Sequence, residues 1–224
     1  YTVAEDPCQV ALRCLEPTAM RAPETLNPFD RALVAYAINA KVTSASACII
    51  EERLPFDPHR KRVTTQIALG ATRAVISCGA AEEVVSRCTS SDPGFQRWAA
   101  KQGLEGRRVL AIAKREMSSK EKGSSLDALE ARMTLCGGIA FEDPLKPTAV
   151  SALERIHALG VEVKMLTGDS PEVAAAIAMR VGLIKKREQV LTGAEFLALK
   201  PAARRQAIRR CQVFARVDPE QKYA

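Results

Sequence analysis

The chain has few aromatic and histidine side chains: its 224 residues include six Phe, three Tyr, one Trp and two His. So few rings leave little surface for stacking nucleic-acid bases, and two histidines are too few for a multi-histidine metal centre. The seven cysteines contain no Cys-x-x-Cys pair, which argues against a disulfide scaffold or a zinc site. No apolar run approaches the roughly 18–20 residues that span a bilayer, and the N-terminus lacks a signal-peptide pattern. These absences favour a soluble protein from a reducing compartment, without a bound metal.

The net charge of +7 comes from Lys and Arg residues spread along the whole sequence. No nucleic-acid-binding motif accompanies them, so we expect no nucleic-acid partner. A basic surface that attracts an anionic nucleotide explains the charge equally well.

A polar, Gly- and Ser-containing stretch at 118–125 indicates a linker between two domains, 1–125 and 126–224. Before it, helical patterns at about 28–40, 80–88 and 95–102 mix with strand patterns. The strand patterns lie at about 47–53, 62–69, 73–77 and 108–113. This order predicts an α+β domain with an antiparallel sheet.

After the linker, strands and helices alternate regularly. Strand patterns at 135–141, 161–166 and 212–217 are separated by helices at 148–159 and 171–181, and a capping box at 192–195 opens a short helix. Alternation of this kind predicts a parallel sheet. The chain as a whole is therefore expected to be α/β, with an incomplete Rossmann-like second domain.

The segment Thr167-Gly168-Asp169 follows the apolar run 161–166 directly. Ser170 and Pro171 then supply an N-cap residue and a first-turn proline, so a strand, a tight loop and a helix are expected. Ligands in open parallel sheets lie at the carboxyl ends of strands, and a helix N-terminus there favours a phosphoryl group. The loop is thus a candidate phosphate site, although an isolated tripeptide of this kind would more often be a plain turn.

Two further motifs accompany this loop: Phe141-Glu142-Asp143-Pro144 upstream and Phe214-Ala215-Arg216 downstream, followed by Pro219 and Lys222. Together the three segments resemble the P-type cation-transporting ATPases, whose phosphorylation domain has a haloacid-dehalogenase-type fold. Residues 138–144 and the compact first half look most similar to bacterial magnesium- or calcium-type pumps.

The resemblance implies roles in phosphoryl transfer. Thr167 and Gly168 would bond the phosphoryl oxygens, and Lys222 would neutralise their charge. Asp169 and Asp143 would shape the phosphate and nucleotide loops, and Lys146 would be the basic residue of the Asp-Pro loop. A helix-capping acid is the plain alternative for Asp169, and a solvated lysine is that for Lys146.

In the first half, Phe56 precedes the cation cluster 59–62, which suits a stacked purine with its phosphates near Lys61. The plain alternative is a core phenylalanine beside a solvated basic turn. The resemblance assigns Phe56, Lys61, Gly79 and Ala80 to the nucleotide site, and adds Asp30 and Arg108. The family's usual lysine before Gly79 is replaced by Cys78, so weaker ATP binding or a shifted pose is expected.

Two parts of the family pattern are missing: the Asp-Lys-Thr-Gly-Thr segment with the nucleophile and the Gly-Asp-Gly-x-Asn-Asp magnesium loop. The resemblance implies that ATP and Mg²⁺ are the cofactors, with the magnesium ligands mostly elsewhere. It further implies a parent pump at the cytoplasmic face of the plasma membrane, with actuator, transmembrane and remaining phosphorylation segments as partners. The chain alone is not expected to complete a catalytic cycle. Without the phosphorylated strand, an exposed sheet edge is expected to rearrange or to pair with another chain.

Two other functions remain open from the sequence. A haloacid-dehalogenase-type phosphatase would use residues 1–125 as a cap and would have no need of Phe56, Lys61 and Arg108 as an adenine site. A non-catalytic nucleotide-sensing module would fit Cys78 and the missing nucleophile.

Overall fold

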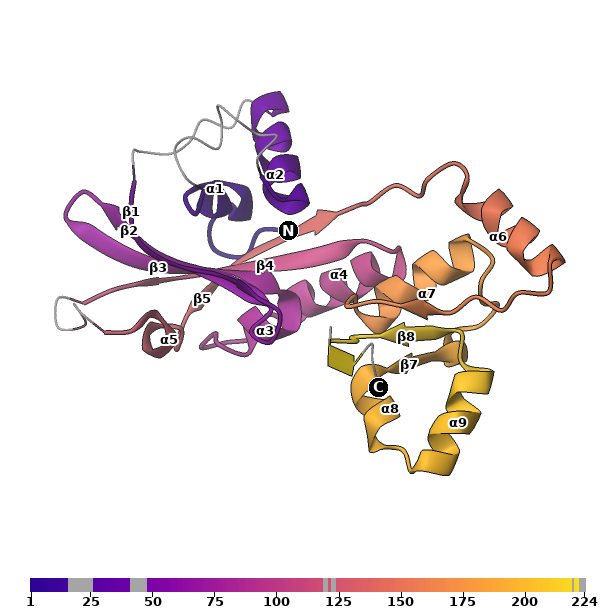
Figure 1. Cartoon of the computed structure of the whole chain (residues 1–224). Coiled ribbons are helices and arrows are strands. Elements are labelled where there is room, and N and C mark those ends of the chain that lie inside the picture. Colours follow the sequence, from indigo (N-terminus) through magenta and orange to yellow (C-terminus); the bar gives the residue numbers. More distant parts are fainter. Residues whose placement is uncertain (16–25, 41–47, 119–120, 122–123, 219, 222–224) are drawn as a thin grey trace. The chain divides into compact units, whose positions relative to one another are not determined.

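The computed structural model describes residues 1–15, 26–40, 48–118, 121, 124–218 and 220–221 (Figure 1). The chain divides into two compact units. The first comprises Tyr1–Ala99 and Val109–Phe141, and the second comprises Ala100–Arg108 and Glu142–Ala224. Each unit is built on its own sheet, antiparallel in the first and parallel in the second, so the expected α/β class is confirmed.

The sheet of the first unit has five strands in the order β1-β2-β3-β4-β5. They are β1 (Ile49–Asp57), β2 (Arg62–Leu69), β3 (Thr72–Ala80), β4 (Arg108–Glu116) and β5 (Thr134–Phe141). Neighbours from β1 to β4 run antiparallel. The β2–β3 hairpin closes with Leu69 opposite Thr72, and Gly70 supplies the positive φ of 61° that such a short turn requires.

Helices cover both faces of this sheet. On one face, α1 (Pro7–Leu12) and α2 (Pro28–Asn39) pack against Ala74 and Ile76 of β3. On the other, α3 (Ala81–Val85), α4 (Pro93–Leu104) and α5 (Leu126–Leu129) form a second core with Val75. Adjacent β3 residues enter different cores because side chains alternate across a strand. Figure 1 shows α1 and α2 on the side of the sheet opposite α3 and α5.

The second unit contains a three-stranded parallel sheet in the order β6-β8-β7. Its elements are α6 (Ala149–Ala158), β6 (Met165–Leu166), α7 (Pro171–Arg180), η3 (Arg187–Gln189), β7 (Val190–Thr192), α8 (Gly193–Ala198), α9 (Pro201–Arg210) and β8 (Val213–Ala215). Buried Ala174 and Ala178 of α7 pack on Val213 and Ala215 of β8. These small side chains let the helix lie close to the sheet.

Helix ends in this unit follow the sequence signals. The Ser170 hydroxyl accepts from the Val173 N–H at the start of α7, and Gly182 ends that helix with a φ of 76°. Thr192 and Glu195 form the expected capping box of α8. No helix within the described ranges is long and apolar enough to cross a bilayer.

Two expectations about strands were wrong. The segment 135–141 was expected in the parallel sheet, but β5 lies beside β4 in the first sheet, so residues 126–141 belong to the first unit. The polar stretch 118–125, partly outside the described residues, therefore does not mark the boundary between the compact units. The expected strand 161–166 is present only as β6, whose two residues pair with Val213 and Phe214 of β8.

Candidate functional site

Four of the residues expected to bind a nucleotide lie around the turn that joins β1 to β2. Phe56, near the end of β1, is 61% exposed, so its ring is available to a ligand. Lys61 occupies the turn with a left-handed φ of 53°. Its carbonyl accepts from the Ala80 N–H at 2.9 Å, which brings the end of β3 against the turn. Phe56, Lys61, Gly79 and Ala80 are thus brought to one end of the β1–β3 strands.

Asp57 builds the backbone of this turn. Its carboxylate accepts from the His59 N–H at 2.7 Å and the Arg60 N–H at 2.9 Å, and its carbonyl accepts from the Lys61 N–H at 2.7 Å. The Arg60 and His59 N–H bonds hold the pKa of the Asp57 carboxyl below its ordinary value. A left-handed residue other than glycine costs roughly 1–2 kcal/mol, and these hydrogen bonds offset that cost.

Gly79 packs closely against this turn, and its expected place in the nucleotide site stays a prediction. A Cβ atom there would lie 2.4 Å from the Lys61 carbonyl oxygen and 2.5 Å from Arg62 Cβ. The space above Gly79 is therefore filled by the turn itself. Glycine is needed at this position so that the Lys61 turn can pack on β3.

Asp30 and Cys78 lie close enough to interact electrostatically on the α1–α2 face of the sheet. Asp30, in the first turn of α2, accepts from Asn27 Nδ2 at 2.7 Å, and burial raises the pKa of its carboxyl. Hydrogen bonding with Cys14 and burial raise the pKa of the Cys78 thiol well above its ordinary value. Cys78 is therefore a neutral thiol at pH 7.

In the second unit, the Thr167-Gly168-Asp169 loop follows β6 and leads into α7, as expected. Backbone bonds tie it to the segment after β8: the Arg216 N–H donates to the Asp169 carbonyl at 2.9 Å, and the Val217 N–H donates to the Thr167 carbonyl at 3.0 Å. Within the described part of the chain, a Cβ atom at Gly168 would meet only the Val217 carbonyl, at 3.9 Å. The loop is thus fixed in shape, with uncrowded space above Gly168.

Arg108 lies with this loop in the second unit. Its guanidinium donates two hydrogen bonds to the Asp169 carboxylate, from Nε to Oδ1 at 2.6 Å and from Nη2 to Oδ2 at 3.0 Å. A longer contact of 3.5 Å joins Nη1 to Asp143. Arg108 is therefore brought to Asp169 and Asp143, and its expected contact with nucleotide phosphates stays a prediction.

The charge of Asp169 is set by competing effects. Burial by itself would raise the pKa of this carboxyl, but Arg108 and the Thr167 hydroxyl, which donates to Oδ2 at 3.0 Å, hold the pKa below its ordinary value. Asp169 is consequently a carboxylate across the physiological pH range.

The remaining expected residues are less defined. Asp143 and Lys146, in the segment after β5, are both exposed. Lys222 lies outside the described residues. The described carboxylates do not fit a magnesium ion: among the residues with defined positions, no cluster of three or more His, Cys, Asp or Glu is placed to hold a metal, and Asp169 faces a guanidinium.

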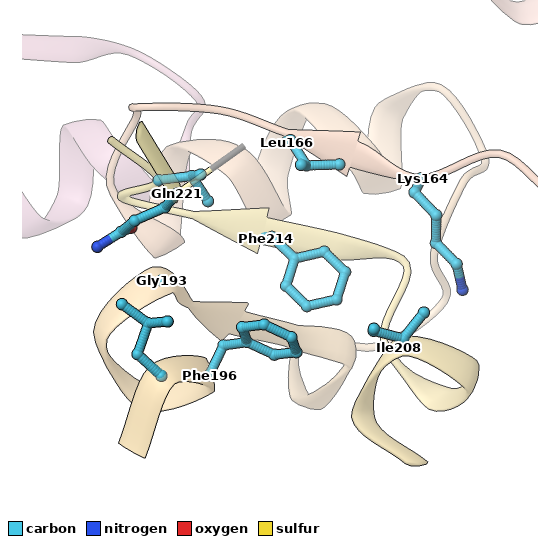
Figure 2. A pocket seen from close by; sticks show the side chains of 9 residues that line it. Lys164, Leu166, Gly193, Phe196, Ile208, Phe214 and Gln221 are labelled. Atoms are coloured by element: carbon cyan, nitrogen blue, oxygen red, sulfur yellow. The ribbon is translucent and has the colours of Figure 1, made fainter. Parts of the chain in front are cut away.

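Two features of the structure were not expected from the sequence. The first is a pocket of about 190 Å³ in the second unit, lined mainly by apolar side chains that include Leu166, Phe196, Ile208 and Phe214 (Figure 2). The Phe196 and Phe214 rings pack edge to face, with their centroids 5.6 Å apart. The second is the buried carboxylate of Glu130 in the first unit. In the sequence, Glu130 is a single acidic residue between two leucine-containing stretches, and this pattern does not indicate which buried side chains it contacts.

Comparison with known proteins defines the class first. Residues 47–221 match the haloacid dehalogenase-like hydrolases. Since this match covers most of the sequence, the chain belongs to the haloacid dehalogenase-like hydrolase family.

Its curated relatives then narrow the assignment. The chain is 32% identical over 213 residues to the magnesium-transporting ATPase, P-type 1, of Salmonella typhimurium, a match that covers 88% of this chain and 23% of that protein. The cation-transporting ATPase pma1 of Synechocystis sp. is 31% identical over 211 residues, with the same two shares. The probable cation-transporting ATPase F of Mycobacterium bovis is 33% identical over 184 residues, covering 75% of this chain and 20% of that protein. The resemblance to P-type cation-transporting ATPases is therefore confirmed, and the chain spans less than a quarter of the length of these relatives.

Proposed function

We propose that this chain binds ATP for a P-type cation pump. The adenine stacks on Phe56, and the phosphates extend toward Lys61. The observation that carries the proposal is the exposed Phe56 ring beside a turn that holds Lys61 against Gly79 and Ala80. Aromatic stacking combined with a nearby cation is suited to a nucleotide.

The second unit supplies the phosphate loop in this proposal. Thr167 and Gly168 receive the phosphoryl group, Asp169 and Asp143 hold the loop shape through Arg108, and Lys146 and Lys222 add positive charge. The carboxylate nucleophile and the magnesium ligands come from other parts of the pump. The parent pump then couples ATP hydrolysis, through an aspartyl phosphate, to cation transport, and residues elsewhere in the pump would hold the Mg²⁺ that would offset the phosphate charge.

The proposed partners follow from the same assignment. They are the actuator, transmembrane and remaining phosphorylation segments of a pump whose ATP-binding part lies at the cytoplasmic face of the plasma membrane. Among the described strands, β6 is at the edge of its sheet, and Leu166 is 43% exposed. We therefore propose that this edge pairs with a further strand, from the parent pump or from a second copy.

A phosphatase with a cap domain is the second candidate, because the family match alone is compatible with it. The relatives named as cation-transporting ATPases favour the pump, since their matches also extend over most of the first unit.

Calorimetric titration with ATP tests the proposed function. The chain is expected to bind ATP in the micromolar-to-millimolar range, and Phe56→Ala is expected to weaken binding by about 1–3 kcal/mol, the value of one base–aromatic stack. Tyr36→Ala removes another exposed aromatic side chain, on α2, and serves as the matched control with unchanged affinity. The proposal would be contradicted if the folded chain bound no ATP, or if Phe56→Ala bound ATP with the same affinity as the wild-type chain.

A further inference from the structure

We infer that Glu130 is a positioning residue for nucleotide binding: its buried carboxylate anchors the two arginines that flank Lys61 and so presents Lys61 to the phosphates. The inference rests on the proposed ATP site and adds to it a residue from a distant part of the sequence. Glu130 follows α5, 69 residues after Lys61 in the chain.

The Glu130 side chain is completely buried, and both of its carboxylate oxygens accept hydrogen bonds. One carboxylate oxygen accepts from Arg60 Nη2 and from the Thr64 hydroxyl. The other accepts from Arg62 Nε at 2.8 Å and from Arg62 Nη2. A buried carboxylate is tolerated only when it is paired and hydrogen-bonded in this way. Its removal would leave the buried Arg62, 4% exposed, without a counter-charge.

This cluster holds the turn from a second direction. The backbone of Lys61 is fixed from β3 by the Ala80 N–H and by close packing over Gly79. The side chains on either side of it, those of Arg60 and Arg62, are held by Glu130, which follows α5. Lys61 is thus the residue between two anchored neighbours, and its left-handed backbone has little freedom to relax.

The ion pairs of Glu130 also determine which cationic side chain of the turn is available to bind a phosphate. Glu130 neutralises charge on Arg60 and Arg62, and the exposed Asp127 lies 3.3 Å from Arg60 as well. Within the described residues, Lys61 takes part in none of the ion pairs. A phosphate arriving at this turn would therefore meet Lys61 as the unpaired positive charge.

A double-mutant cycle measured by ATP calorimetry tests this inference. Glu130→Gln keeps the side-chain volume but removes the charge, and it is expected to weaken ATP binding about tenfold. In a Lys61→Ala background the same change is expected to have no further effect, because Glu130 acts through Lys61. Binding of adenosine, which has no phosphate, is expected to be equal in the wild-type chain and in Glu130→Gln.

Two more variants provide a control and an alternative to Glu130→Gln. Asp127→Asn removes a charge that lies 3.3 Å from Arg60, but the Asp127 side chain is 70% exposed, so the ATP affinity of this variant is expected to stay within about twofold. If Glu130→Gln does not fold, Thr64→Val removes one hydrogen bond to Glu130 at constant shape and is expected to give a smaller loss that is again absent without Lys61.

The outcomes separate the two proposals. If the wild-type chain binds ATP but Glu130→Gln binds equally well, or if its loss persists in the Lys61→Ala background, the inference is overturned and the proposed function stands. If the wild-type chain does not bind ATP, the proposed function fails and the inference fails with it.

Discussion

At the scale of single residues, the Asp169 carboxylate is held by two hydrogen bonds from the Arg108 guanidinium. Arg108 makes two bonds to Asp169, whose side chain is 17% exposed, and only a long contact to Asp143, whose side chain is 74% exposed. Charge-assisted bonds to a partly buried carboxylate stabilise far more than exposed ion pairs. Asp169 should therefore contribute to stability in a way that depends on pH.

We predict that Asp169→Asn lowers the free energy of unfolding by about 1–2 kcal/mol at pH 7, from the loss of charge-assisted hydrogen bonds. The folded pKa of Asp169 is depressed, so this contribution is present above the ordinary Asp value of about 3.9 and is lost as the pH falls through the folded pKa. Urea unfolding followed by circular dichroism should show the difference at pH 7 and a much smaller one at pH 2. Asp143→Asn, the exposed control, should change stability by less than about 0.5 kcal/mol at either pH. An Asp169→Asn deficit that is the same at both pH values would contradict this explanation.

The resemblance to P-type ATPases selected the residues of the candidate site, and their roles in ATP binding stay predictions. The structure shows that the Phe56–Lys61 segment and the end of β3 lie at adjacent strand ends. The packing of Gly79 against Lys61 and the anchoring of Arg60 by Glu130 were not predictable. Both depend on three-dimensional contacts that leave no local pattern in the sequence.

At the scale of elements, local signals were reliable where they describe helix ends. The capping box at Thr192 and Glu195 opens α8, and Ser170 caps α7. Strand partners were less predictable: β5 carries a strand pattern suited to either sheet, and its pairing with β4 is a long-range choice. The pattern of apolar residues in a strand indicates that the strand is buried. It does not indicate which strand will lie beside it, because that depends on contacts across the whole sheet.

Thr192→Ala tests the capping box. The Thr192 hydroxyl accepts from the Glu195 N–H at 3.2 Å and donates to Glu195 Oε2 at 2.7 Å, so its loss should destabilise the second unit by about 1 kcal/mol. The Thr192 hydroxyl also lowers the pKa of the Glu195 carboxyl, and that part of the effect should fade as the pH falls below the ordinary Glu value. Amide hydrogen exchange in α8 would measure the change. Ser151→Ala, an exposed position in α6, is the control and should leave exchange in α8 unaltered. Unchanged protection of α8 in Thr192→Ala would show that the cap does not hold this helix.

At the scale of the whole molecule, the two units carry different parts of one proposed function. The first unit offers an aromatic ring and a cation at the ends of antiparallel strands, and the second offers a loop at the carboxyl end of a parallel strand. The haloacid dehalogenase-like family match and the P-type relatives both extend across these two units. In the proposed function, ATP binding is assigned to the first unit.

The most direct test of this central claim is an ATP titration followed by backbone amide NMR. We predict that the amide signals that shift with ATP cluster at Asp30, Phe56, Lys61 and Ala80, and that they do so without added Mg²⁺, because none of these residues is proposed as a metal ligand. Signals that stay fixed there while those lining the Phe196–Phe214 pocket move would contradict the assignment of the nucleotide to the first unit.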